Sequence, residues 1–483
     1  MVDVSNSARL DLKHEPSHQP ARWVMLSVML GTGTVSLSNS SFNPALATLM
    51  QQFALSEAQV SWVMVIFLMS MSLSLLLAGY LSQTLGKRNV YLMALLTFVG
   101  ISAVGMLAQS FNTVLLVRAI QGFASGLMIP LSLGLIFAVT PQSERGAATG
   151  IWGAMIMLTL ACGPMLGALL LLKWGWPALF SVNLPFGLIA LLVGYKTLPK
   201  QPQGGVSAFD WQGFSTLSIS IVALLLALSQ IKTRADFWAP AFYLPLLLAI
   251  LMGGLFWWLP AKRKAVLIPA QLFASQGFNF SLIISVLHTV GLFVMLFAIP
   301  LLVQNALHLS PLWTGALLMS SALCTSVCSK WAGNCLDRFG AKCLISIGLL
   351  LTSSAFIGLG AGIHLPVTFL MLCMMVHGLG FAMSYMPSTT AGLNSLNNQE
   401  LVTQGAAINN LLRRLCSAVA VVLAALYLQF RSASLLSLHD PQWAQLIAIR
   451  ELFLICAGGL LLALPFAWKF PDIKNASACK ASM

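Results

Sequence analysis

Two ten-residue segments decide the fold: GYLSQTLGKR at positions 79–88 and GNCLDRFGAK at positions 333–342. Each begins with a glycine, has a second glycine seven positions later and contains basic residues near its end. Gln83 occupies the fifth position of the first segment, and Asp337 occupies the fifth position of the second. Two related segments far apart in one chain indicate that the chain contains an internal repeat.

The repeated segments lie in a chain that is too apolar for a water-soluble protein. Only 8% of the 483 residues are charged and 58% are hydrophobic, whereas soluble domains have about 25% charged residues. A membrane helix needs roughly 20 apolar residues. The sequence therefore predicts an all-α integral membrane protein and excludes a soluble enzyme, a secreted module and a disordered regulator. The fourteen apolar runs lie at 23–44, 59–82, 90–109, 112–137, 148–172, 177–195, 212–231, 240–259, 279–303, 312–331, 342–362, 366–388, 407–428 and 450–470.

The basic residues predict the orientation, because cytoplasmic loops are enriched in Lys and Arg. Of the 25 Lys and Arg residues, seventeen fall on the side of the two termini. Three others, Arg118, Arg413 and Arg414, lie within runs or at their edges. The remaining five fall on the opposite side: Lys173, Lys232, Arg234, Arg431 and Arg450. Both termini are therefore expected to be cytoplasmic. The formal charge of +13 serves membrane topology, so no nucleic-acid partner is predicted.

The spacing of the repeat predicts an insertion. The two segments follow the second and the tenth run, so they are eight spans apart, whereas a six-plus-six duplication would place them six spans apart. The runs at 212–231 and 240–259 supply the two extra spans. The predicted organisation is a tail at 1–22, a six-helix bundle at 23–200, two inserted helices at 201–264, a second six-helix bundle at 265–470 and a tail at 471–483. Parallel halves of this kind are typical of rocking secondary transporters.

Five motifs in this order make the chain similar to the fourteen-helix drug–proton antiporter branch of the major facilitator superfamily. The resemblance covers essentially the whole chain and implies that fold, with proton-driven export of small amphipathic molecules by alternating access. No cofactor is implied; the implied partners are a small-molecule substrate, protons and the lipid bilayer. The matching residues are Gly79, Gly86, Lys87 and Arg88; Arg118, Gln121, Gly122 and Gly126; Gly150, Gly163, Pro164 and Gly167; Trp174, Trp176, Phe180, Asn183, Pro185 and Gly187; and Asp210, Trp211 and Gly213.

Charged residues of the two repeated segments are candidates for a latch between helices. Lys87 and Arg88 end the first segment, and Asp337 and Arg338 belong to the second, which is bounded by Gly333 and Gly340. Charges at these places can pair in one conformation and separate as the halves rock. The alternative is that the basic residues only anchor the loops. Gln83 stands where the family has an acid, so the first latch would be a hydrogen bond.

The segment from Gly163 to Gly167 has two interpretations. Pro164 removes a helix hydrogen bond, and glycines let a neighbouring backbone approach closely. The functional interpretation is a bend that helps to seal the transport cavity against leak. The alternative is ordinary tight packing of a membrane helix.

Three ionisable side chains inside predicted spans are candidates for transport or coupling. Arg118 lies about 9 Å into its span, at 1.5 Å per residue. Charges inside spans indicate functional sites, although Arg118 is shallow enough to extend toward water. Gln121 and Gly122 follow it in the same motif. His288 and His377 lie near the middle of their runs and titrate near physiological pH; the alternative is that they are neutral, hydrogen-bonded core residues.

The first run carries an unusually polar stretch, SLSNSSFNP at 36–44. At least one face of this helix must meet protein or water, so Ser38, Asn39, Ser41 and Asn43 are candidate cavity-lining residues, with helix packing as the alternative. The resemblance places an Asp at the position of Ser38. All twelve acidic residues fall in tails, in loops or in the first turn of a span, which puts carboxylate-based proton coupling in doubt.

These observations favour a secondary exporter in the cell inner membrane. The alternative cargo is an endogenous metabolite such as a carboxylate siderophore. A membrane enzyme or receptor lacks support, since the sequence has no phosphate-binding Gly-Lys-Ser/Thr loop, no HExxH and no Gly-x-Ser-x-Gly motif. Cys324 and Cys328 share a helix face, but neither a His nor an acid completes a metal site nearby. No periplasmic adaptor is identified by the sequence.

Overall fold

The computed structural model describes residues 21–141, 144–200, 209–231, 234–258, 267–362, 366–396, 399–437 and 440–470. Within them, twelve stretches are long and apolar enough to cross a membrane. One of the twelve, Glu57–Met106, contains two helices, and α1 is a further, more polar helix of 21 residues. The described residues therefore form fourteen long helices, as the sequence predicted.

Short helices connect or extend several of the long ones. The long helices are α1 (Ala21–Ser41), α3 (Glu57–Leu81), α4 (Lys87–Met106), α5 (Phe111–Phe137), α6 (Arg145–Trp174), α8 (Asn183–Thr197), α9 (Trp211–Ser229), α10 (Pro240–Trp258), α11 (Gln276–Pro300), α12 (Pro311–Phe339), α13 (Ala341–Ala361), α14 (Val367–Asn394), α15 (Gln399–Leu435) and α16 (Pro441–Leu461). The short ones are α2 (Ala45–Gln52), η1 (Ser82–Gly86), α7 (Ala178–Ser181), η3 (Arg234–Trp238), η5 (Ala270–Ala274), η6 (Leu301–Ala306) and α17 (Leu464–Trp468).

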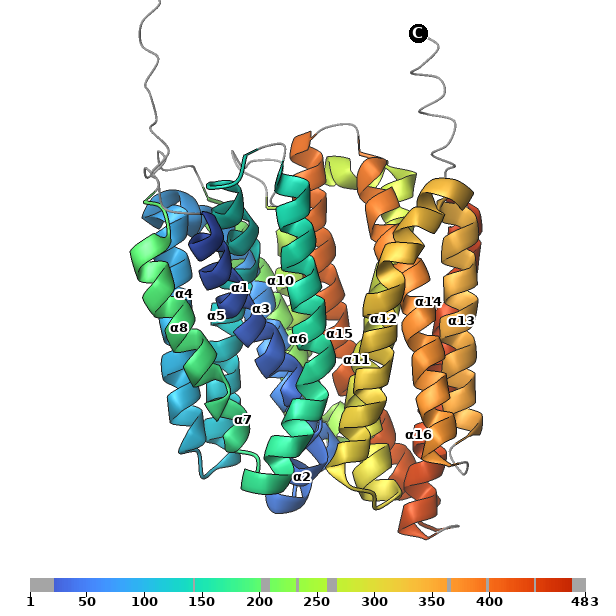
Figure 1. Cartoon of the computed structure of the whole chain (residues 1–483). Coiled ribbons are helices and arrows are strands. Elements are labelled where there is room, and N and C mark those ends of the chain that lie inside the picture. Colours follow the sequence, from blue (N-terminus) through green and yellow to red (C-terminus); the bar gives the residue numbers. More distant parts are fainter. Residues whose placement is uncertain are drawn as a thin grey trace, which may run out of the picture.

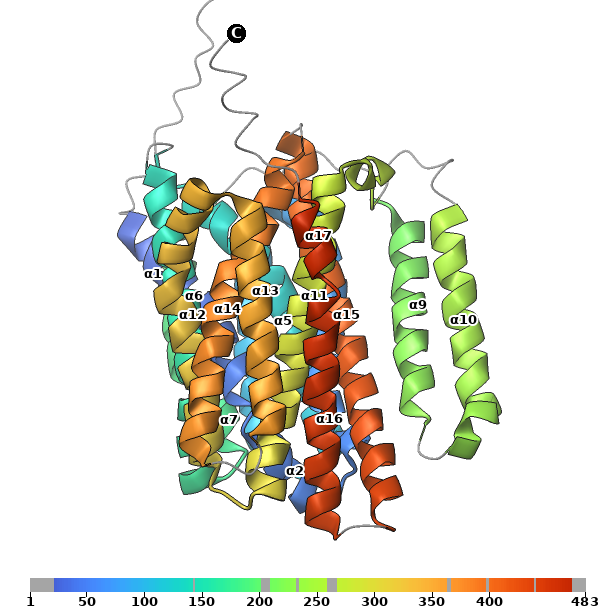
Figure 2. The ribbon, with the colours of Figure 1, turned by 90° about the vertical axis from the view of Figure 1, so that its right-hand side faces the viewer.

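The helices gather into two halves. Helices α1 to α8 form the N-terminal half and α11 to α17 form the C-terminal half, which lie side by side (Figure 1). The first residue of α1 and the last residue of α17 lie on the same side of the molecule (Figures 1 and 2). We call this the terminus side and the opposite end the far side.

The two halves share one hydrophobic core only on the far side. That core contains Leu46 and Val60 of the N-terminal half together with Ile299 and Leu302 of the C-terminal half, all fully buried. A separate cluster around Tyr91 belongs to the N-terminal half, and two smaller clusters lie in the C-terminal half, one of them together with Phe256 of α10. The cluster to which both halves contribute therefore draws its N-terminal members from the far side, and α6 with α12 and α3 with α15 also pack across the boundary between the halves.

Helices α9 and α10 stand outside both halves as a pair (Figure 2). Helix α9 packs against α10, α3 and α15. On the terminus side Tyr80, at the end of α3, meets the rings of Phe209 and Trp211 at 4.9 and 5.4 Å between centroids. Residues 201–208 and 259–266, at the predicted edges of this insertion, lie outside the described residues, as do most of the two tails. The boundaries of the predicted domains stay predictions.

The repeated segments adopt the same backbone turn. Gly86 has φ +84° and precedes α4, and Gly340 has φ +81° and precedes α13. Only glycine adopts this conformation readily, which explains the second glycine of each copy. The loops expected here are otherwise helical: Gly79 lies in α3, residues 82–86 form a π-helical turn, and Gly333 lies in α12.

The last helix begins earlier than predicted. Helix α16 starts at Pro441, whereas the apolar run starts at 450. Glu451 therefore lies in the middle of α16, and the expectation that it occupies the first turn of a span is wrong. The segment before it contains Gln442, Gln445 and Arg450. These polar residues lower the local hydropathy, so the pattern places the start of the helix too late, although the segment is helical.

Candidate functional site

A buried polar network links four helices of the N-terminal half. Asn183 of α8 donates from Nδ2 to Ser38 Oγ of α1 and to Ser102 Oγ of α4, both at 3.1 Å. Gln121 of α5 donates from Nε2 to the same Ser102 Oγ at 2.9 Å. All four side chains are fully buried. Ser38, which stands where the resemblance places an Asp, thus joins a chain of hydrogen bonds that leads to α5.

Arg118 lies at the end of this network. Its Nη1 donates to Gln121 Oε1 at 3.3 Å, and its Nε donates to the carbonyl oxygen of Val63 at 3.4 Å. The guanidinium carbon lies 4.7 Å from the centre of the Phe42 ring and 4.2 Å from that of Phe67. The residue is 1% exposed, so its side chain is enclosed by protein and does not extend to water. Gly122, next to Gln121, lets the backbone of α5 approach Phe67 of α3.

The other candidates on α1 and the short turn after it are mostly buried by protein. Ser41 and Asn43 are 0% and 4% exposed, like the fully buried Ser38, while Asn39 is half-buried. Ser41 Oγ donates to the backbone carbonyl of Ser38 at 3.3 Å. These contacts are those of helix packing. Asn39 is the one of the four whose side chain retains accessible surface, so it is the best remaining candidate for a cavity wall.

The glycines of the α6 motif lie at the closest approach between α6 and α1. A Cβ at Gly163 would overlap Ser40, and one at Gly167 would overlap the backbone of Ser41. On another side of α6, the carbonyl of Pro164 lies against Gly315 of α12, across the boundary between the halves. Helix α6 continues through Pro164. The residues of this motif therefore bring α6 into close contact with α1 of its own half and with α12 of the opposite half.

We expect Gly167→Ala to destabilise this packing and to lower transport strongly, because the obstructing atoms are backbone atoms that cannot rotate away. Overpacking of this kind costs about 1–3 kcal/mol. Gly153→Ala, in the same helix but outside the motif, is the matched control, since nothing lies within 4 Å of the added carbon. Thermal unfolding in detergent and transport in vesicles should separate the two variants. Equal behaviour of both would contradict the packing role.

The loop latch is described only in its first copy. Arg88 donates from Nη2 to the carbonyl oxygen of Tyr195 at 2.7 Å and lies over the Tyr195 ring. Tyr195 belongs to α8, so this contact holds together helices of one half. Lys87 and Gln83 lie beside it at the turn. The side chains of Asp337 and Arg338 lie outside the described residues, so the second copy stays a prediction.

The two histidines lie within the C-terminal half. His288 of α11 is hydrogen bonded through Nε2 to Ser384 Oγ at 2.6 Å. His377 of α14 is hydrogen bonded through Nδ1 to Ser321 Oγ at 3.0 Å. Both are 1% exposed, and the ring of Phe381 contacts both. They therefore form one cluster, separate from the network around Arg118.

Amide side chains close the far side. Gln304 of η6 donates from Nε2 to the carbonyl oxygen of Pro44 at 2.7 Å and to Thr314 Oγ1 at 3.2 Å, and its Oε1 accepts from Thr48 at 3.4 Å. Asn305 accepts from Gln51 Nε2 at 2.9 Å. These contacts join α2 of one half to η6 of the other. We call Gln304, its three partners and the Gln51–Asn305 pair the far-side latch; the sequence analysis did not identify it.

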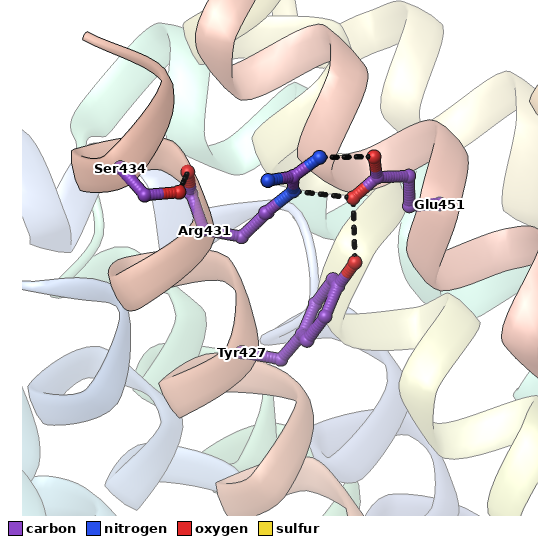
Figure 3. Close-up of polar contacts among 4 residues, drawn as sticks. All are labelled: Tyr427, Arg431, Ser434 and Glu451. Atoms are coloured by element: carbon purple, nitrogen blue, oxygen red, sulfur yellow. Dashed lines mark hydrogen bonds and ion pairs between the residues drawn. The ribbon is translucent and has the colours of Figure 1, made fainter. Parts of the chain in front are cut away.

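A charged cluster joins α15 to α16 (Figure 3). Glu451 accepts two hydrogen bonds from Arg431, both at 2.7 Å, and one from the Tyr427 hydroxyl at 2.6 Å. The side chains of Arg431 and Glu451 are 39% and 31% exposed. A two-bonded Arg–carboxylate pair fixes geometry as well as charge. The cluster ties two neighbouring helices of the C-terminal half, and its acid is already neutralised.

The family model of the Major Facilitator Superfamily matches residues 28–297. The chain belongs to this superfamily. It is 29% identical to the tetracenomycin C resistance and export protein of Streptomyces glaucescens, over 71% of this chain and 66% of that protein. It is 26% identical to the lincomycin resistance protein LmrB of Listeria innocua, over 83% of this chain and 85% of that protein. These relatives are consistent with the drug–proton antiporter branch that the motifs indicate.

Two further comparisons bear on cargo and fold. The riboflavin transporter RibZ of Clostridioides difficile is 25% identical over 78% of this chain and 82% of that protein. Among solved structures, a bacterial homologue of the human lysosomal transporter Spinster, inward-facing and unoccupied, aligns with a TM-score of 0.69 at 13% identity, covering 93% of this chain and 97% of that one. This likeness shows the fold. The chain is thus a multi-pass membrane transporter of the superfamily.

Proposed function

We propose that this protein is a secondary exporter that uses the proton gradient to expel small amphipathic molecules by alternating access. The proposed location is the cell inner membrane, with both termini cytoplasmic, because the tails and loops predicted on that side contain seventeen of the 25 Lys and Arg residues. In that orientation the far-side latch closes the outer end. The resistance and export proteins among its relatives support the export of drug-like molecules.

The charge of the N-terminal half supports neutral or anionic cargo. Arg118 is buried among α1, α3 and α5, and its described polar partners are an amide and a backbone carbonyl. Among the described residues, the one ion pair lies in the C-terminal half, where Arg431 neutralises the carboxylate of Glu451. A buried cation without an acidic partner repels other cations strongly where the dielectric constant is low. This acid-free network is the observation that carries the proposal.

We expect weak protection against dicationic quaternary ammonium compounds and better transport of neutral or anionic molecules. A pump-deficient host that expresses the protein should be tested with both compound classes side by side. Ser38→Asp is the matched variant: it places a carboxylate beside Asn183 and should improve the transport of cations. Strong resistance confined to dications in the wild type would overturn this prediction.

The energy source is tested in vesicles. With an imposed pH gradient and no ATP, we expect cargo to move, and an ionophore that collapses the gradient should stop it. Transport that follows ATP while the gradient is clamped would contradict a secondary exporter.

A second candidate cargo is an endogenous metabolite. The riboflavin transporter among the relatives favours this alternative, as does the acid-free network around the buried cation Arg118, which suits a carboxylate. The same vesicles, loaded with anionic metabolites instead of drugs, distinguish the two.

A further inference from the structure

The C-terminal half contains two buried imidazoles that share one aromatic neighbour. The Phe381 ring is perpendicular to that of His288, with centroids 5.6 Å apart, and stacks on that of His377 at 6.0 Å. His288 lies near the middle of α11, and His377 lies in the part of α14 that packs against α12 and α13. Helices α11 and α14 are in direct contact. The two rings therefore belong to one site at mid-depth.

Each imidazole uses one nitrogen and leaves the other unbonded. His288 Nε2 is paired with Ser384 and His377 Nδ1 with Ser321. His288 Nδ1 and His377 Nε2 are buried and lack a hydrogen-bond partner among the described residues. A buried polar atom without a partner costs about 1–3 kcal/mol, so its presence in both rings requires an explanation. The Ser384 hydroxyl donates to the carbonyl oxygen of Gly380 at 2.7 Å, so His288 Nε2 carries the hydrogen that faces Ser384. In a neutral imidazole the other nitrogen is then an acceptor, so His288 Nδ1 can bind a proton.

Among the side chains that the structure describes, none near the pair provides a counter-charge. Helix α12 brings Cys324 close to Gly378, next to His377, and α13 brings the Phe356 ring to 5.4 Å from His377. Helix α15 brings Arg413, which is bonded to Asn410 and lies 4.9 Å from the centre of the Tyr385 ring of α14. The acid of α16, Glu451, is bonded to Arg431 and Tyr427.

The remaining described neighbours of α11 and α14 bring no acid either. Arg414 adds a second cation on α15. The residues of α2, η5, η6 and α17, which also pack against α11, include no titratable side chain. A proton on this pair is therefore unfavourable in the described conformation, because none of the described side chains supplies a negative charge to compensate it.

A partly exposed aromatic pair covers the histidines. Phe381 and Tyr385 are half-buried, whereas the histidines are 1% exposed. Their rings stack at 4.5 Å between centroids. Rotation of Phe381 would remove a neighbour from both imidazoles at once. Access of water or cargo to this ring can thus control access of a proton to the pair.

We propose that His288 and His377 together bind the transported proton, with Ser384 and Ser321 as positioning residues and Phe381 as the cover. This proposal rests on proton-driven export as the function. One proton binds an unbonded ring nitrogen when the far side is open, and the same nitrogen releases it when the terminus side is open. The described conformation, packed on the far side, is the one with neutral histidines.

The test removes the free nitrogens but keeps the serine bonds. In His288→Gln the amide nitrogen replaces Nε2, and in His377→Asn an amide atom replaces Nδ1, so both serines retain a partner. Wild type, each single variant and the double variant are reconstituted in liposomes with a fluorescent pH indicator inside. Two rates are measured: cargo uptake driven by a pH gradient, and exchange of labelled for unlabelled cargo without a gradient. His308→Gln, in the far-side turn after η6, is the control.

We expect the double variant to lose gradient-driven uptake and cargo-linked proton flux, at least about tenfold, while exchange continues. Wild-type proton flux and pH profile in the double variant would overturn the proposal, because a structural role is preserved by these substitutions. If the double variant does not fold, the single variants decide: a shifted pH profile in either supports the proposal, and unchanged profiles in both overturn it. Absence of any proton flux in the wild type would instead refute proton-driven export itself.

Discussion

Replacing Arg118 with alanine should abolish transport while the protein still inserts into the membrane. The guanidinium is enclosed between Phe42 and Phe67 and donates hydrogen bonds to Val63 and Gln121. Hydrogen bonds from charged groups contribute about 1.5–3 kcal/mol each, so losing both should reduce transport by roughly a hundredfold or more. Gradient-driven uptake in vesicles, normalised to the amount of inserted protein, measures the loss.

Two further substitutions separate the roles of this side chain. Arg118→Met fills the space between the two rings without donating a hydrogen bond, so we expect it to fold and not to transport. Arg118→Lys keeps the charge but lacks the planar guanidinium, which stacks on the aromatic rings and donates to two acceptors. We therefore expect at most partial activity. Normal transport by both variants would show that Arg118 only fills space.

The membrane spans could be predicted from sequence because hydropathy is a local property. Each of the fourteen predicted runs overlaps a helix, and the errors lie where polar residues extend a helix beyond its apolar part, as at Gln442 and Gln445 of α16. The second glycine of each repeated segment was also informative, since Gly86 and Gly340 have positive φ. Spacing indicated a turn there, although it did not show that helix continues almost up to each glycine.

The contacts of the site could not be predicted, because they join residues far apart in the chain. Arg118 was a candidate from its charge alone, but its enclosure depends on Phe42 and Phe67, which lie on other segments. Asn183 was recognised only as part of a motif, and its bond to Ser38 spans 145 positions. Gln304 gave no signal at all, because an amide just after the end of an apolar run is not unusual until its partner is known.

Gln304→Met should weaken the closed far side. The substitution keeps the length of the side chain but removes the bonds to Pro44, Thr48 and Thr314. The carbonyl of Pro44 then loses this donor, and a buried polar group without a partner costs about 1–3 kcal/mol. That free energy shifts the balance between the two access states by about 5-fold to 100-fold toward the state open on the far side. The π-helical turn η6 that carries Gln304 is a type of distortion often found at functional sites.

Hydrogen–deuterium exchange measures this shift without added labels. We expect faster exchange in peptides covering α2 and η6 of Gln304→Met, since the two segments protect each other only while the far side is closed. Gln51→Met is the matched control: it removes the bond to Asn305 from the same interface, but that bond is exposed, so water replaces it and exchange should change little. Equal protection of both segments in wild type and Gln304→Met would mean that apolar packing between the halves, and not the buried amide, holds the far side closed.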